Sequence, residues 1–202
     1  MLTLTKVFVK SCVTSLSRRS LFFAVMNGVY FGCILVGALL GQLLYVTPTY
    51  GSELVEVHEF FLGLDWPLMI LAIFLFNLVL SSFLFVTLPG LAFLPLSAVI
   101  VAIRAALWGF LLTEVPTPQF LAAFPTLVLE GEGYVLTSVA GVDLGLSWLK
   151  PRWVYKGEGL SRLESFRRAL KDCLRIYVLV ATFLLAAAVV EVATISFLGP
   201  LS

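Results

Sequence analysis

Hydrophobic residues in this chain lie in long unbroken blocks, and polar residues gather between the blocks. The blocks cover residues 21–46, 66–88, 91–112, 120–149 and 176–197. A hydrocarbon core about 30 Å thick needs about 20 apolar residues in a helix that rises 1.5 Å per residue. Each block is long enough for one crossing. The pattern predicts an all-α integral membrane protein, a single polytopic membrane domain over residues 1–202 with about five transmembrane helices.

Helix-breaking residues occur at two places, one between blocks and one within a block. Pro89-Gly90 stands between the second and third blocks and predicts a tight turn there. The fourth block contains Pro125 and the run Glu130-Gly131-Glu132-Gly133, and glycines beside carboxylates disfavour a straight helix surrounded by lipid. We therefore expect this segment either to be kinked and buried, or to begin with a partial, re-entrant helix over 120–130.

Glycines in the first block are spaced as two GxxxG pairs, Gly28 with Gly32 and Gly37 with Gly41. The two pairs lie on different sides of a helix. Such spacing lets two helix backbones approach closely, which favours contacts with two neighbouring helices. The alternative interpretation is that glycine is simply common in membrane helices.

Composition and charge support the membrane interpretation and give it an orientation. Only 12% of residues are charged, against about 25% in ordinary soluble domains, which disfavours a soluble fold. Four of the thirteen Lys and Arg precede residue 20 and eight lie within 150–175. Basic segments stay in the cytoplasm, and four predicted spans separate these two. We expect a multi-pass plasma membrane protein with its N-terminus cytoplasmic and its C-terminus outside.

Residues 157–175 alternate apolar and basic positions at helical spacing, and Ser161 and Glu164 have the spacing of a capping box. This predicts a cytoplasmic amphipathic helix on the membrane surface. Its basic side chains are a candidate surface for anionic lipids, a cytoplasmic ATPase or another protein, and the alternative is plain interfacial anchoring. The candidates are Arg162, Arg167, Arg168, Lys171 and Arg175. Lipid, other membrane proteins and further copies of the chain are the expected partners, and nucleic acid is not.

Four charged residues fall deep within predicted spans: Arg104, Glu130, Glu132 and Glu191. An unpaired charge at the bilayer centre costs about 2.5–3.5 kcal/mol or more, so these side chains should face the protein interior. Counting from the outer helix ends places Arg104, Glu130 and Glu191 in one layer, about 10 Å below the outer surface. We expect Glu130 to pair with Arg104.

This layer has more carboxylates than cations, and three interpretations stay open. The first is an internal ion pair that fixes which helices are neighbours. The second is a cation or proton site on a transport path. The third is that Glu191 or Glu132 reaches the outer face. Asp143 lies nearer the cytoplasmic end and could either snorkel to the membrane surface or bond to the first turn of a neighbouring helix, and Asn77 could bond between helices.

No catalytic signature accompanies these charges. The sequence contains no serine–histidine, HExxH or aspartyl protease pattern. His58 beside Glu59 is the only histidine in the chain, and the predicted environment is a solvated interface. Cys12, Cys33 and Cys173 show no paired or metal-ligand spacing. We expect no enzyme activity, no cofactor and no metal site.

A short pattern runs from Pro125 to Glu130, five residues later, and then to Gly141 and Gly145 in a helix of small residues. It resembles the stage II sporulation protein M family, integral membrane proteins of bacteria and archaea. Asn77 is similar to an asparagine that this family carries before its central hairpin. Thr126 and Leu127 replace a His-Gly pair typical of the family, and Arg104 lies roughly where another asparagine is often seen.

The resemblance implies a scaffold, because the sporulation members hold a cell-wall-degrading complex in the membrane during engulfment. Small size and the lack of a sizeable soluble domain favour the same function, a non-enzymatic scaffold or complex subunit. The alternative is a small cation- or proton-linked transporter or channel subunit. It would use the carboxylate and arginine layer, and five spans would then require a homo-oligomer.

Overall fold

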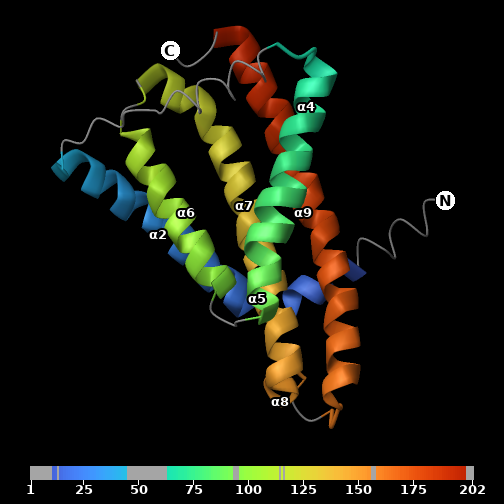
Figure 1. Cartoon of the computed structure of the whole chain (residues 1–202). Coiled ribbons are helices and arrows are strands. Elements are labelled where there is room, and N and C mark those ends of the chain that lie inside the picture. Colours follow the sequence, from blue (N-terminus) through green and yellow to red (C-terminus); the bar gives the residue numbers. More distant parts are fainter. Residues whose placement is uncertain are drawn as a thin grey trace.

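Every regular element that the computed structural model describes is a helix (Figure 1). The described residues are 11–12, 14–44, 63–92, 96–113, 115, 117–155 and 158–198. The elements are α2 (Ser20–Leu44), α4 (Trp66–Leu75), the π-helix η1 (Phe76–Thr87), α5 (Leu88–Ala92), α6 (Leu96–Leu112), α7 (Thr117–Leu149), α8 (Pro151–Val154) and α9 (Arg162–Leu198). The predicted interfacial His58 and Glu59 lie outside the described residues.

Three helical segments are long and apolar enough to cross a membrane: Ser20–Leu44, Trp66–Ala92 and Arg162–Ser196. Leu96–Leu112 is apolar but shorter. Many large apolar side chains on these segments point outward, and Leu21 is 79% exposed. Such surfaces are typical of helices that face lipid. The helices are therefore compatible with a multi-pass membrane protein.

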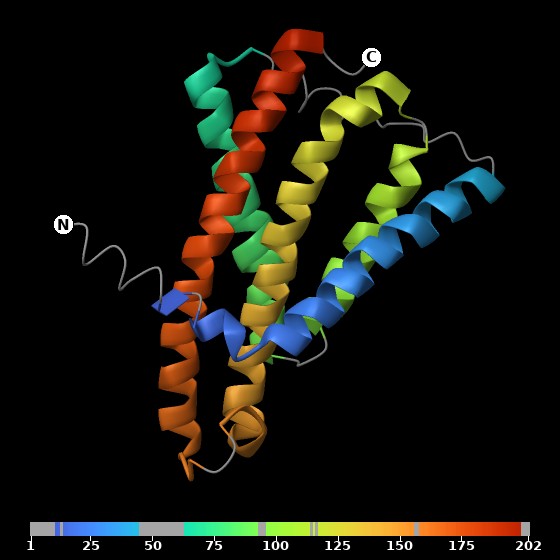
Figure 2. The ribbon, with the colours of Figure 1, turned by 180° about the vertical axis from the view of Figure 1, so that it is seen from behind.

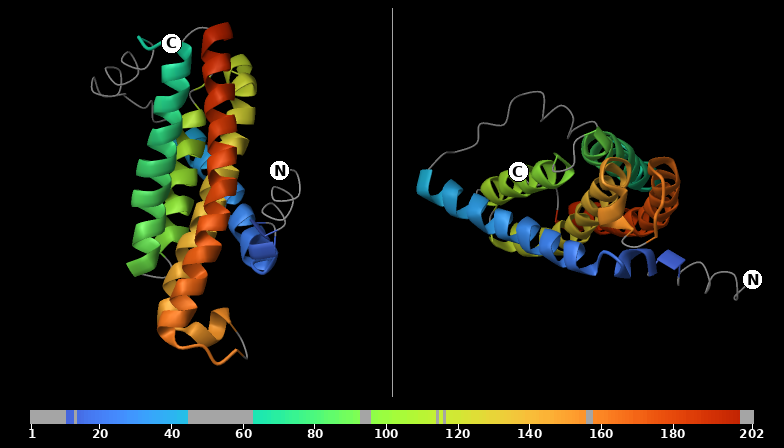
Figure 3. Two further views of the ribbon diagram at one scale, coloured as in Figure 1. Left: turned by 90° about the vertical axis from the view of Figure 1, so that its right-hand side faces the viewer. Right: turned by 90° about the horizontal axis from the view of Figure 1, so that it is seen from below.

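α7 lies at the centre of the bundle and packs along α9, and the continuous helix α4-η1-α5 contacts both (Figures 1 and 3). α2 and α6 form a second pair that contacts α7 and then diverges from the α7–α9 pair toward one end (Figure 2). The buried core follows α7, where Gly133 to Gly141 is buried without a break. Inward-facing small and polar residues thus concentrate on the central helix.

Glycines set the distance between α2 and α6. A Cβ added at Gly37 would lie 1.9 Å from the Ala106 carbonyl oxygen, and one added at Gly109 would lie 1.9 Å from the Ile34 carbonyl oxygen. A Cβ at Gly41 would lie 2.8 Å from the Thr113 hydroxyl. The second GxxxG pair therefore makes the predicted close contact.

The first GxxxG pair behaves differently. A Cβ added at Gly28 or Gly32 meets nothing within 4 Å. Among the described residues this side of α2 has no packed neighbour. The prediction of close packing on two sides of this helix therefore holds for one side.

The predicted turn at Pro89-Gly90 is wrong. The helix continues through both residues to Ala92, and α6 begins at Leu96. The π-helical stretch explains how the helix continues through the proline. At its end, the Leu88 N–H donates to the Phe83 carbonyl five residues earlier. This wider turn accommodates a proline, which lacks an N–H and clashes with the carbonyl of an ordinary helical turn. Gly90 is used for close packing instead, since a Cβ there would meet the Ser97 hydroxyl.

Of the two alternatives for the fourth segment, the partial helix over 120–130 is wrong, because α7 is helical without a break over 33 residues and contains Pro125. The burial expected in the other alternative is confirmed, since Glu130, Gly131 and Gly133 are buried. Its glycines give room to side chains of neighbouring helices. A Cβ at Gly131 would lie 2.5 Å from the Tyr30 ring, and one at Gly133 would lie 2.8 Å from Leu184. The glycines beside Glu130 and Glu132 thus serve packing between helices and do not unwind the backbone.

The predicted amphipathic helix and the fifth span form one helix, α9, which begins at Arg162 and not at 157. The capping box at its start is confirmed. The Ser161 N–H donates to Glu164 Oε2 at 3.0 Å, and the Glu164 N–H donates to Ser161 Oγ at 3.3 Å. These bonds satisfy backbone donors that the first turn of a helix leaves free.

Candidate functional site

A chain of hydrogen bonds connects two charged residues of the predicted spans, Arg104 and Glu130, through the middle of the bundle. Arg104 Nη2 on α6 donates to the Tyr134 hydroxyl on α7 at 2.7 Å. The Tyr134 hydroxyl donates to Asn77 Oδ1 on η1 at 2.8 Å, and Asn77 Nδ2 donates to Glu130 Oε1 on α7 at 2.7 Å. The connection from the guanidinium to the carboxylate therefore runs through two neutral side chains. No direct Arg104–Glu130 ion pair occurs among the described residues.

Every donor in this chain points in the same direction, from the cation toward the anion. Hydrogen bonds aligned in this way polarise and strengthen one another in a low-dielectric interior. Tyr134 is fully buried, and Asn77 and Glu130 are nearly so. The Arg104 guanidinium carbon also lies 4.1 Å from the centroid of the Tyr134 ring, an additional cation–π contact. We call Arg104, Tyr134, Asn77 and Glu130 the arginine–glutamate relay.

Local structure explains why these four side chains meet. Glu130 and Tyr134 are four residues apart on α7 and so share one helix face. Asn77 lies in the first turn of η1, where the buried positions recur every four to five residues (77, 81, 82, 86 and 87), as a π-helix requires. Tyr30 of α2 covers Gly131 next to Glu130. The relay thus links α6, α7 and η1 at one level of the bundle.

The other two predicted members of the layer lie at its edges. Glu191 on α9 is close enough to Glu130 for an electrostatic interaction. Glu132 is only partly buried and lies beside Asn27 of α2, on a different side of α7 from Glu130. Arg104 Nε is buried without a hydrogen-bond partner among the described residues. Arg104, Glu130 and Glu191 are therefore brought near one another, whereas Glu132 faces another helix.

Sequence reasoning missed Tyr134, which bridges the relay, and Tyr30, which covers Gly131. The available signal for Tyr134 was its position four residues after Glu130 within an apolar helix. A phenol in a membrane helix can donate and accept a hydrogen bond at once, which suits a residue between an arginine and an asparagine. No comparable signal existed for Tyr30, because its role depends on how α2 crosses α7.

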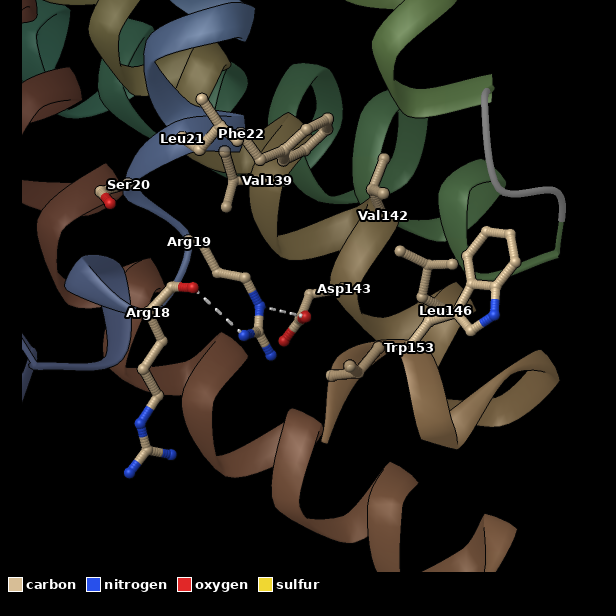
Figure 4. Close-up of a pocket in the computed structure, with 11 residues that line it drawn as sticks. Arg18, Arg19, Ser20, Leu21, Phe22, Val139, Val142, Asp143, Leu146 and Trp153 are labelled. Carbon is tan, nitrogen blue, oxygen red and sulfur yellow. Dashed lines mark hydrogen bonds and ion pairs between the residues drawn. The ribbon is translucent and has the colours of Figure 1, made fainter. Parts of the chain in front are cut away.

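A second polar cluster lies at the end of α7 opposite its Thr117 end. Asp143 Oδ1 accepts a hydrogen bond from Arg19 Nε at 2.5 Å, just before the first turn of α2 (Figure 4). Tyr155 lies between two guanidinium groups, with Arg19 at 5.8 Å and Arg168 at 4.8 Å from its ring centroid. Burial, followed by the nearby Asp143 carboxylate, raises the pKa of the Tyr155 hydroxyl, so this residue stays neutral. Asp143 therefore takes one of the two environments expected for it.

The N-terminal segment and the start of α9 contact each other in the same cluster. Asp172 Oδ1 accepts hydrogen bonds from the Ser15 hydroxyl and from Arg175 Nη1, each at 2.9 Å. Arg168 forms an ion pair with Glu158. Two members of the predicted basic surface, Arg168 and Arg175, are thus bound within the chain.

Other members of that surface remain outward-facing. Arg162, Arg167 and Lys171 are exposed and form no ion pair with any residue that the structure describes. Leu163, Leu170 and Leu174 are exposed on the same helix. This stretch of α9 therefore retains the mixed apolar and basic surface that the sequence predicts.

Across the described residues, His, Cys, Asp and Glu side chains do not gather in groups of three or more that could hold a metal ion. Comparison of the chain with protein-family models, curated proteins and solved structures finds no match.

Proposed function

We propose that this chain is a non-enzymatic integral membrane scaffold, or a subunit of a membrane complex, with five spans and a cytoplasmic N-terminus in the plasma membrane. The observation that carries the proposal is the arginine–glutamate relay. It hydrogen-bonds Tyr134, Asn77, Glu130 and one nitrogen of the Arg104 guanidinium within the protein, and it ties three helices together. A polar network satisfied in this way rigidifies a membrane bundle.

The contact between the two basic segments supports the proposed topology. Ser15 bonds to Asp172 and Arg19 bonds to Asp143, so both segments lie at one end of the bundle. An even number of crossings between them, with both in the cytoplasm, satisfies the positive-inside rule. α7 would cross as the fourth span because its polar side chains point inward, which keeps charge away from lipid.

Outward-facing surfaces support a scaffold. Around Gly28 and Gly32 the α2 backbone is open, and small residues at helical spacing are the usual contact of one membrane helix with another. On the same helix, Gly37 shows how close such a contact becomes when it is filled. The resemblance to stage II sporulation protein M gives the same functional class.

The test measures the size of the complex formed by the full chain, extracted from its native membrane in mild detergent. We expect a complex larger than the monomer, and the double substitution Gly28→Leu with Gly32→Leu should reduce it to the monomer without lowering thermal stability. Val29→Leu, at a partly exposed position of the same helix, is the matched control. A chain that extracts only as a monomer would refute the scaffold.

A small cation- or proton-linked transporter or channel subunit is the second candidate. The supporting observation is that Glu191 lies near Glu130 of the relay, while Arg104 is the one basic residue in the predicted spans. Thermal stability of the purified chain across pH and a panel of cations separates the two functions. Stabilisation by one cation that is lost in Glu130→Gln or Glu132→Gln would favour transport. Ion-independent destabilisation by Glu130→Gln and Arg104→Leu would favour the scaffold.

A further inference from the structure

A cavity of about 510 Å³ opens between the start of α2, the last turns of α7 and α8 (Figure 4). Its volume lies within the range of ligand pockets, about 300–1,000 Å³. In the proposed topology the cavity lies at the cytoplasmic membrane surface, because it is bounded by the basic N-terminal segment. It is separate from the arginine–glutamate relay, which lies nearer the Thr117 end of α7.

One wall of the cavity is cationic. Arg19 directs Nε to Asp143 Oδ1, and its Nη1 lies 3.5 Å from the Arg18 carbonyl, so donors of the guanidinium remain available for a ligand (Figure 4). Lys150 Nζ lies 3.9 Å from the ring centroid of Trp153, another lining residue. Arg18 also lines the cavity, so its lining carries two cations and one carboxylate, Asp143.

The helix start adds to this positive potential. Ser20, Leu21 and Phe22 line the cavity and form the first turn of α2, a helix of 25 residues. Backbone N–H groups in a first turn have no partner within the helix, and the helix dipole favours an anion there. The cavity therefore has the donors and the charge to hold a phosphate group.

The remaining wall of the cavity is apolar. Val139, Val142 and Leu146 of α7 form it, with Leu21 and Phe22 opposite (Figure 4). Trp153 at the rim is 64% exposed, and tryptophan is enriched where membrane proteins meet the interface. Inorganic phosphate would gain nothing from contact with an apolar wall, whereas the acyl chain of a lipid would bury apolar surface against it.

We propose that this cavity binds an anionic phospholipid, with the phosphate on Arg19 and the α2 start and the first carbons of one acyl chain against Val142 and Leu146. The cation count favours a lipid with a net negative headgroup over a zwitterionic one. The guanidinium fork suits phosphate oxygens, because it presents several donors in one plane. The bound lipid would join α2, α7 and α8. The inference depends on the membrane placement above but not on scaffolding.

The test uses the purified full chain in a neutral detergent and three probes: dihexanoyl phosphatidylglycerol, dihexanoyl phosphatidylcholine and inorganic phosphate. At a concentration 100-fold above its Kd, phosphatidylglycerol should raise Tm by about 5 °C. Phosphatidylcholine and inorganic phosphate should each give a much smaller shift. An equal shift from phosphatidylcholine would show non-specific lipid binding, and an equal shift from phosphate would show an anion site; either overturns the proposal.

Variants locate the effect. Leu146→Trp and Val142→Phe fill the apolar part of the cavity, and either one that keeps the lipid-free Tm should lose the phosphatidylglycerol shift. Arg19→Lys keeps a charge beside Asp143 but removes the fork, and binding should weaken about tenfold. Arg162→Gln changes an exposed cation away from the cavity and should leave binding unchanged. Equal losses in Arg162→Gln and Arg19→Lys would indicate diffuse charge attraction and overturn the site.

Discussion

The crossing of α2 and α6 makes a sharp prediction about two glycines on one helix. In Gly37→Ala the new Cβ would lie 1.9 Å from the Ala106 carbonyl oxygen, and ordinary contact begins at 3.4 Å. The helices must therefore separate by the difference, about 1.5 Å, because backbone atoms cannot turn aside as a side chain can. In Gly28→Ala the new Cβ meets nothing within 4 Å.

The two substitutions should change stability in opposite directions. Overpacking of a tight contact costs about 3 kcal/mol at the upper end of the usual range. Replacing glycine by alanine in a helix returns up to about 1 kcal/mol. Gly37→Ala should thus destabilise by about 2 kcal/mol, while Gly28→Ala should be neutral or stabilise by up to about 1 kcal/mol. At about 2–4 °C per kcal/mol, their Tm values should differ by about 4–12 °C.

Thermal unfolding in detergent, followed by tryptophan fluorescence, measures this difference. Gly109→Ala should behave like Gly37→Ala, because its Cβ would meet the Ile34 carbonyl oxygen at the same crossing. The double variant Gly37→Ala with Gly109→Ala should lose less than the sum of the single losses, since one separation of the helices relieves both contacts. Equal stability of Gly37→Ala and Gly28→Ala would refute the close crossing.

Three further predictions concern polar contacts. Tyr134→Phe removes the bridge between Arg104 and Asn77 and should destabilise by about 2–3 kcal/mol in the same unfolding assay, because two buried partners lose a bond; Tyr177→Phe, which removes one bond to Thr87, should cost about 1 kcal/mol. Ser161→Ala should cost about 1 kcal/mol and Ser161→Asp much less, measured by hydrogen exchange in the first turn of α9. Arg168→Glu should destabilise more than Arg167→Glu in thermal unfolding, since Arg168 pairs with Glu158 and stacks on Tyr155 whereas Arg167 is exposed.

Length and hydrophobicity predicted the helices well because they depend on composition over about twenty residues. The α2 start, the α9 cap and the apolar character of Trp66–Ala92 all follow from the sequence. Helix ends that fall inside apolar sequence were harder to predict. Pro89-Gly90 has the local chemistry of a turn, yet the π-helical hydrogen bonding before it lets the helix continue. That choice depends on packing against α7 and α6, which no local rule contains.

In the candidate site, too, some features could be predicted from the sequence and others could not. The burial of Glu130 and the partial burial of Arg104 near one level could be predicted, because an unpaired intramembrane charge is costly and depth follows from residue counting. The connection between them could not be, since it requires Tyr134 and Asn77 to meet across two helices. Likewise, the glycines at 131 and 133 have the composition of a broken helix, but Tyr30 and Leu184 occupy the space they leave.

Two polar levels on α7 fix its position along its own axis. The relay at Glu130 ties α7 to α6 and η1, and Asp143 ties it to the start of α2. The levels are thirteen positions apart, about 20 Å along the helix. Sliding α7 by one turn, about 5.4 Å, would break both sets of bonds, and the buried side chains of the relay would find no water to replace them. Glycines determine the distance between the helices, and these bonds determine the position of each helix along the axis of its neighbour. A bundle held in both respects presents its open α2 face and its basic α9 surface in a constant geometry, which is what a scaffold requires.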